Sequence, residues 1–131
     1  MSTREEVVLG FLRTCIDRRF VAESRHAFEQ FTGLMPTDYW HESYAGGSAL
    51  PPPNTIGEDY VVKNGARFLG WQAHIDGCGG IPGARDEDIE RMLDQRIQLM
   101  LEKYPTTHQF RHFRILASNS GINIREVHHP K

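Results

Sequence analysis

Cysteine, long apolar runs and an excess of charge of one sign are all scarce in this sequence. Its two cysteines are too few for a disulfide framework, so we expect reduced thiols and a cytoplasmic protein. The longest apolar runs fall far short of the ~20 residues that a membrane helix needs, so we expect no membrane partner. The net charge of −2 supplies no basic field that would attract nucleic acid.

The chain does contain enough apolar residues for one ordinary core. With 131 residues, of which 39% are hydrophobic, we predict a single domain over residues 1–131. The stretch AGGSALPPPNTIG, at about residues 45–57, interrupts the pattern, because three successive prolines forbid a helix or a central strand. We interpret this stretch as a long surface loop within the domain.

Helical periodicity dominates the first third of the chain. Apolar residues at helical spacing behind serine and threonine capping residues predict a helix over residues 2–20, in which Cys15 is a small buried apolar residue. A second helix is predicted over residues 21–31, and a short third turn or helix after Asp38. The third segment carries aromatic residues around a histidine, a group that either anchors a core or lines a ligand pocket. Its members are Tyr39, Trp40, His41 and Tyr44.

The second half of the chain mixes strand and helix signals. Asn64-Gly65 lies between two β-prone runs, which predicts a hairpin, and a strand then leads through His74. An amphipathic helix with acidic residues in its first turn is predicted over residues 85–104. A last hairpin is predicted around residues 118–121. The order favours an α+β fold, with N-terminal helices and one long amphipathic helix packed on one face of an antiparallel, curved sheet.

Part of this order resembles a known family. The opening EEVVLGFLRTCIDRRF, a further short helix, and then GARDEDIERMLDQRIQLMLEKYPTTHQFRHFRILASNSGINIREV resemble the NTF2-like proteins of the polyketide-cyclase and limonene-epoxide-hydrolase type. The resemblance implies long strands that wrap around a cone-shaped pocket for an apolar ligand. The Asp, Arg, Asp constellation of the epoxide hydrolases is not carried over. Arg125 is followed by Glu126, and no aspartate stands two residues after the arginine.

The stretch GWQAHIDGCGG places an imidazole, a carboxylate and a thiol within five residues. In one interpretation His74 is a general base oriented by Asp76, and we name these two as the catalytic candidates. In a second, Cys78 is a nucleophile with His74 as its base. In a third, all three residues bind a metal, although the spacing is not that of common zinc sites. The fourth alternative is a strand with a polar face that ends in a loop, and we predict no metal and no cofactor.

Two other motifs bear on ligands. GCGGIPGARD lacks the glycine and lysine spacings of nucleotide-binding loops, and acidic residues occupy the start of the following helix, so nucleotide binding is excluded. In HQFRHFR, strand alternation puts His112 and Arg114 on one face. Both faces of this strand carry polar residues, so one of them must include buried polar groups or border a cavity or a subunit interface.

Two functional hypotheses follow. The first is a small-molecule pocket protein, an isomerase, cyclase or hydrolase using acid–base chemistry at His74 and Asp76, with a ligand-binding set beside them. That set is Tyr39, Trp40, His112 and Arg114. The second is a non-catalytic homo-oligomeric accessory or protein-interaction module. In both cases we expect a homodimer that pairs through an exposed sheet edge.

Overall fold

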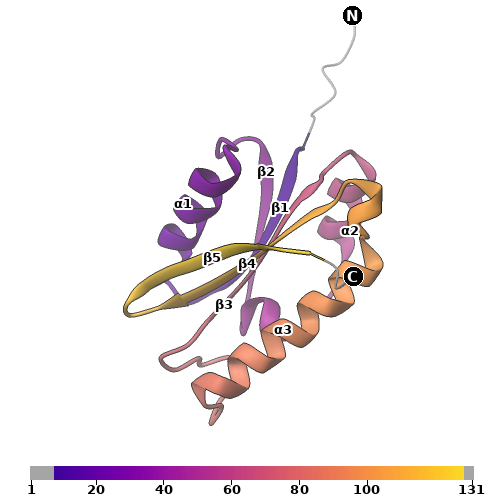
Figure 1. Ribbon diagram of the computed structural model, residues 1–131. Helices are drawn as coiled ribbons and strands as arrows, with labels where there is room; N and C mark the ends of the chain where they lie inside the picture. The colour runs from indigo at the N-terminus through magenta and orange to yellow at the C-terminus, as the bar shows by residue number, and fades with distance from the viewer. Residues whose placement is uncertain (1–7, 129–131) are drawn as a thin grey trace, which may run out of the picture.

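The computed structural model describes residues 8–128 (Figure 1). Its main elements, in chain order, are β1 (Gly10–Cys15), α1 (Val21–Thr32), β2 (Tyr39–Tyr44), α2 (Ile56–Lys63), β3 (Phe68–His74), α3 (Asp86–Lys103), β4 (Arg111–Ser118) and β5 (Gly121–Val127). Short 3₁₀ turns lie at Gly47–Ala49 and Thr106–His108. No helix in the described range is long and apolar enough to cross a membrane.

The five strands form one sheet in the order β2-β1-β3-β4-β5. β1 pairs in parallel with both β2 and β3, and β3 pairs in parallel with β4. Only β5 runs antiparallel, as the second strand of a hairpin with β4. The mixture of helices and strands is confirmed, but the expected antiparallel sheet is wrong, since four neighbouring strands are parallel. An open sheet of this kind also differs from the cone that the NTF2-like resemblance implied.

Helices cover both faces of the sheet. Figure 1 shows α1 on one face and α2 and α3 on the other. The expectation that the helices share one face is therefore wrong. Parallel neighbours need crossover connections, and crossovers on both sides bury both faces of the central strands.

Each face has its own core. The core on the α1 side is small and contains Leu12, Phe28, Leu34, Tyr39, Phe113 and Ile115. The core on the α3 side is larger, and its members include Phe11, Val61, Leu69, Trp71, Ile89, Leu93, Ile97 and Leu101. Ile89, Leu93 and Ile97 belong to the apolar stripe predicted for the long helix, and that helix is confirmed as α3.

The first element differs most from its prediction. The helix predicted over residues 2–20 is instead the strand β1 within the described residues, and its expected capping residues lie outside them. All six residues of β1 are buried, because the strand lies between β2 and β3 with helices on both faces. A strand buried on both faces shows no alternation, so its apolar residues also fit a helical spacing.

Two further local predictions need correction. The segment after Asp38 is the edge strand β2 rather than a helix. Asn64-Gly65 ends a helix instead of forming a hairpin: Asn64 is the C-cap residue of α2, and Gly65 has a φ of 108°. Of the surface loop predicted at about residues 45–57, the proline-containing middle is a loop, whereas Gly47–Ala49 is a buried 3₁₀ turn and α2 begins at Ile56. The helix α1, the strand β3 and the last hairpin are confirmed.

The topology singles out one place on the sheet. The helix that follows β1 and the helix that follows β3 lie on opposite faces, so the chain leaves these neighbouring strands in opposite directions. Doubly wound sheets bind ligands in the crevice that such a divergence opens at the carboxyl ends of the strands. Cys15 ends β1 and His74 ends β3, so both residues lie at this crevice.

Candidate metal centre

Cys15 is held at the carboxyl end of β1 by the neighbouring strand. Its backbone N–H donates to the side-chain oxygen of Gln72 on β3 at 2.8 Å. The amide nitrogen of Gln72 donates in turn to the hydroxyl of Ser24 on α1 at 2.9 Å. All three residues are buried, so this chain of hydrogen bonds fixes the end of β1 against β3 and α1.

His74 is buried at the end of β3, with a relative exposure of 1%. Its Nδ1 atom lies 3.0 Å from the carbonyl oxygen of Ile75, so Nδ1–H donates to that oxygen. When the ring is neutral, its lone pair is on Nε2; burial alone would lower the pKa of His74, but Cys15, the Ile75 carbonyl and Asp17 raise it. Nε2 is buried and makes no hydrogen bond to any described residue. A histidine that donates one N–H to a backbone carbonyl and leaves the other nitrogen free has the arrangement of a metal ligand.

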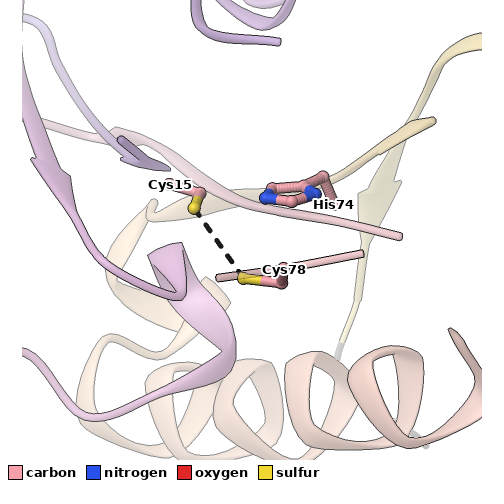
Figure 2. A group of neighbouring side chains, drawn as sticks. All are labelled: Cys15, His74 and Cys78. Carbon is pink, nitrogen blue, oxygen red and sulfur yellow. Dashed lines mark hydrogen bonds between the residues drawn. The ribbon is translucent and has the colours of Figure 1, made fainter. Parts of the chain in front are cut away.

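Cys78 completes a cluster with these two residues (Figure 2). The ligand atoms of Cys15, His74 and Cys78 all lie within 4.8 Å of one another. The two sulfur atoms are 4.0 Å apart. Zinc–sulfur bonds of ~2.3 Å at a tetrahedral angle would place them about 3.8 Å apart. The two sulfur atoms therefore have nearly the spacing that a zinc ion requires.

Glycines bring the surrounding loops close to the cluster. Gly47 has a φ of 57°, and a Cβ atom there would lie 2.5 Å from the backbone oxygen of Gln72. At Gly80 a Cβ atom would lie 2.4 Å from the backbone nitrogen of Gly46. Only glycine fits at these two positions, so the loops after β2 and after Cys78 can pack against the strand ends.

Asp17 and Arg19 form a second layer beside the cluster. Arg19 donates from Nη2 to Asp17 Oδ2 at 2.7 Å and from Nε to both carboxylate oxygens at 3.1 Å. The hydrogen bonds from Arg19 lower the pKa of Asp17 to about 2, against the opposing effect of its partial burial. Asp17 Oδ2 lies 3.5 Å from His74 Nε2. An ionised carboxylate is thus held next to the free nitrogen.

Arg19 also ties this pair to the loop that carries Cys78. Its Nη1 and Nη2 atoms donate to the backbone oxygens of Asp76 and Gly77, at 3.3 and 2.9 Å. One guanidinium therefore joins the segment after β1 to the segment after β3, across the crevice between the two strands.

The electrostatics of the cluster favour a thiolate at Cys15. Burial alone would raise its pKa, but the His74 imidazole and the backbone N–H groups of Asp17 and Gly46 lower it to about 7. Burial and the neighbouring Cys15 raise the pKa of the Cys78 thiol. The thiolate is the form of cysteine that binds metals, and a metal ion would stabilise it at both residues.

A small cavity opens onto the cluster. Its volume is about 260 Å³. Its walls come from the segments after β1, after β2 and after Cys78. The lining residues are Cys15, Ile16, Asp17, Ala45, Gly79 and Gly80. Cys15 and Asp17 are the polar groups of this lining, so a molecule that enters the cavity meets the cluster.

The catalytic candidates from the sequence separate in the structure. His74 lies in the cluster, as does Cys78. Asp76 points elsewhere: its Oδ2 atom accepts the backbone N–H of Asn119 at 2.7 Å, in the turn between β4 and β5. The φ of Asp76 is 66°, which turns the chain out of β3. Its contacts are those of a residue that stabilises a turn, and Asp17 takes the place beside His74.

The four predicted ligand-binding residues do not gather around His74. Tyr39 donates its hydroxyl to Glu29 at 2.6 Å on the α1 side of the sheet, whereas Trp40 is 42% exposed on the other side. His112 accepts the Trp71 indole N–H at 3.0 Å within the core.

Arg114, the last member of that set, lies over α3. It donates to Asp94 at 2.7 Å and to Glu90 at 3.2 Å. These ion pairs give its buried guanidinium the partners that strand alternation had led us to attribute to a pocket or a subunit contact.

Sequence reasoning missed Cys15, Asp17 and Arg19 as members of the site. The predicted helix made Cys15 part of an apolar stripe and drew attention away from Cys-Ile-Asp-Arg-Arg. The sequence did contain a signal. Cys-Ile-Asp-Arg-Arg begins at the last residue of β1, and His-Ile-Asp-Gly-Cys begins at the last residue of β3. Two such endings in one α/β chain indicate strand ends that can meet.

Comparisons with known proteins identify no relative: no family model, no curated protein and no solved structure matches this chain.

Proposed function

We propose that this chain binds one zinc ion through Cys15, His74 and Cys78 and catalyses the addition of water to a small electrophilic substrate. The observation that carries the proposal is the buried His74 Nε2 atom, which lies beside two thiols without a hydrogen-bond partner among the described residues. A buried polar atom without a partner costs about 1–3 kcal/mol. A bound metal ion would supply that partner.

The ligand set selects among metals. Two thiolates and one imidazole match zinc, whereas calcium and magnesium prefer oxygen ligands. Three protein ligands leave the fourth tetrahedral position open, which is the arrangement of catalytic rather than structural zinc sites. The cavity reaches the cluster at Cys15 and Asp17, so the open position would face it.

The neighbouring residues would orient a water molecule there. Zinc at such a site lowers the pKa of a coordinated water to about 7. Asp17, ionised at neutral pH, would accept a hydrogen bond from that water and orient it. Arg19 restrains the Asp17 carboxylate with its hydrogen bonds, which keeps this acceptor in place beside His74.

The size of the cavity limits the substrate. A volume of about 260 Å³ lies below the range of roughly 300–1,000 Å³ that is usual for drug-sized ligands. Ile16, Ala45 and two glycines supply its apolar walls. Carbon dioxide is small and apolar and has an electrophilic carbon, so its hydration is the first reaction to test.

This proposal keeps the predicted small-molecule pocket and changes the roles within it. His74 is a metal ligand rather than a general base, and Asp17 replaces Asp76 as the carboxylate beside it. Within GWQAHIDGCGG, His74 and Cys78 belong to the proposed site, together with Cys15 at the end of β1.

The test combines metal content with turnover. We expect the wild-type protein to bind one zinc ion per chain and to accelerate carbon dioxide hydration in a stopped-flow assay with a pH indicator. His74→Ala should bind zinc at least about 100-fold more weakly, since losing a ligand costs more than the 10–100-fold typical of lost outer partners. His26→Ala, which removes an exposed histidine on α1, is the matched control and should behave as wild type.

A further variant separates binding from catalysis. Asp17→Asn should retain the zinc and lose most of the activity, because the amide cannot replace the charge of the orienting carboxylate. A wild-type protein without zinc would overturn the proposal, and so would a zinc-loaded wild-type protein with no activity on carbon dioxide or on a short ester such as 4-nitrophenyl acetate.

One observation favours the second hypothesis, a homo-oligomeric interaction module. A groove of about 600 Å³ lies between β2 and α2 and is lined in part by Trp40, Ile56 and Tyr60. These three side chains are 42%, 76% and 56% exposed. They flank β2, which is an edge strand of the sheet. Exposed apolar groups beside an open edge are typical of a surface that a second copy covers.

A further inference from the structure

We propose that Cys15 and Cys78 are also an oxidation site, at which a peroxide converts the two thiols into an intramolecular disulfide. The inference rests on the proposed function only where it concerns competition with zinc. Both cysteines are free, and their sulfur atoms are 4.0 Å apart (Figure 2). A disulfide would use the same two sulfur atoms that the metal needs, so zinc binding and disulfide formation exclude each other.

The geometry allows the bond to form with small movements. A disulfide joins its sulfur atoms at ~2.0 Å, so the pair must approach by about 2 Å. Cys78 lies in a loop with Gly77 before it and Gly79 and Gly80 after it. A Cβ atom at Gly77 or Gly79 would meet no other atom within 4 Å, whereas Gly80 packs against Gly46, so the room for movement lies at the two residues that flank Cys78. The loop can shift toward the end of β1, which the sheet holds in place.

The cavity sets the order of the two steps. Cys15 lines the cavity, whereas Cys78 is not among its lining residues. A small peroxide that enters this cavity meets Cys15, and we assign the first step to that residue. A larger oxidant, such as a second protein, has no comparable access, since Cys15 and Cys78 are only 3% and 7% exposed.

The chemistry is balanced with hydrogen peroxide as the oxidant. The Cys15 thiolate attacks one peroxide oxygen, the O–O bond breaks, and the products are a sulfenic acid and hydroxide, which takes up a proton to give water. The Cys78 thiol then loses its proton as its sulfur attacks the sulfenic sulfur, the S–S bond forms, and the S–O bond breaks to release hydroxide, which takes up that proton to give a second water. Together, two thiols and one peroxide give one disulfide and two waters.

His74 and Asp17 remain in place when the sulfurs are joined. Neither residue loses its contacts to Ile75 and Arg19, since these do not involve the cysteines. A reductant that restores the thiols therefore restores the complete ligand set. The oxidation site is reversible and would switch the metal centre between a zinc-binding and a zinc-free form.

The test follows the masses of peptides from the full-length protein. The zinc-free wild type, treated with equimolar hydrogen peroxide, should yield a cross-linked pair of peptides containing Cys15 and Cys78, with the loss of two hydrogens. Tris(2-carboxyethyl)phosphine should reverse it. Prior loading with zinc should slow the reaction at least about tenfold, because thiolates bound to the metal are less nucleophilic.

Single variants test the order of the steps. Cys78→Ser should accumulate a sulfenic acid at Cys15, which dimedone labels, whereas Cys15→Ser should give little label at Cys78. Equal labelling of both variants, or label at Cys78 alone, would overturn the assigned order. The wild-type peptide map needs no substitution, so it decides the main point even if a variant fails to fold.

The outcomes separate this inference from the proposed function. Free thiols that remain unlinked, or that proceed to sulfinic acid without a cross-link, would overturn the oxidation site even in a protein that binds zinc. A cross-link in a protein that binds no zinc would support the oxidation site and overturn the proposed metal centre.

Discussion

The two ring nitrogens of His74 have different contacts. Nδ1–H donates to the Ile75 carbonyl, and this contact fixes both the tautomer and the ring orientation. Nε2 then faces two thiols in a buried place where no described residue donates to it. Native proteins satisfy nearly all of their buried polar atoms, and the carboxylate that faces Nε2, Asp17 Oδ2, lies at 3.5 Å, so a metal ion held with the two thiols would complete the contacts of this nitrogen.

At the same scale, Asp17 should link stability to pH. Arg19 lowers the pKa of Asp17 from its ordinary 3.8 to about 2. A lowered pKa in the folded state means that the ionised pair stabilises the fold above pH 4 and that this contribution disappears as the pH falls toward 2. In thermal melts, the Tm advantage of the wild type over Asp17→Asn should therefore be largest near neutral pH and shrink in acid. An advantage that stays constant or grows in acid would contradict the assigned ion pair.

The sequence predicted some of the site residues and not others, because only some of them are close together along the chain. His74 and Cys78 stand four positions apart, so their proximity needed only one strand and its loop. Cys15 and His74 are 59 positions apart in the chain (74 minus 15) and meet only because β1 and β3 are parallel neighbours. Sequence spacing carries no information on that pairing, and Asp76 was chosen as the partner carboxylate because it was near in sequence.

At the scale of elements, the short helices and strands were the hardest to predict from the sequence. α3 has 18 residues, a capping box and a continuous stripe, so its periodicity identified it. β1 and α2 have six and eight residues, and their patterns fit both helix and strand. Their state follows from tertiary packing: β1 is a central strand buried on both faces, and α2 is held by a buried acid.

That acid, Glu58, joins three elements. It is 1% exposed and accepts hydrogen bonds from Arg13 on β1 at 2.9 Å, and from Lys103 and Tyr104 at the end of α3 at 2.8 and 2.5 Å. Burial alone would raise the pKa of Glu58, but these three donors lower it. The carboxylate is therefore the ionised centre of a network that attaches α2 to the sheet.

Removing this centre should cost stability. Glu58→Ala leaves the buried Arg13 without its closest ion-pair partner, and breaking a buried pair in this way costs roughly 3–5 kcal/mol. Asp59→Ala is the matched control: its side chain is 57% exposed, and its pair with Lys103 is worth at most about 1 kcal/mol. Urea denaturation followed by circular dichroism measures both, and equal losses for the two variants would contradict the role given to Glu58.

At the scale of the whole molecule, the fold offers two places where another molecule could bind. The candidate metal centre lies at the crevice between β1 and β3, and the groove lies beside the free edge of β2. The sequence predicted mixed α and β content and an exposed edge strand, but it did not predict which strands are neighbours. The crevice exists only because of that order, so the site could not be located before the fold was known.

The free edge leads to a prediction about assembly. We expect a homodimer at micromolar concentration, with the β2 edge and its exposed apolar neighbours in the interface. Trp40→Lys should weaken the dimer at least tenfold in sedimentation velocity, because it places a charge on this surface without disturbing a core. Leu99→Lys, an exposed residue on α3, is the control and should leave the dimer intact. A wild-type monomer at this concentration would contradict the expectation.

X-ray absorption at the zinc edge of the zinc-loaded, full-length protein tests the central claim most directly, because it reports the atoms bound to the metal. The account predicts two sulfur neighbours at about 2.3 Å and nitrogen or oxygen neighbours at about 2.0 Å, with one zinc ion per chain. A first shell without sulfur, or a protein that retains no zinc after dialysis, would contradict the assignment of Cys15, His74 and Cys78 as a metal centre.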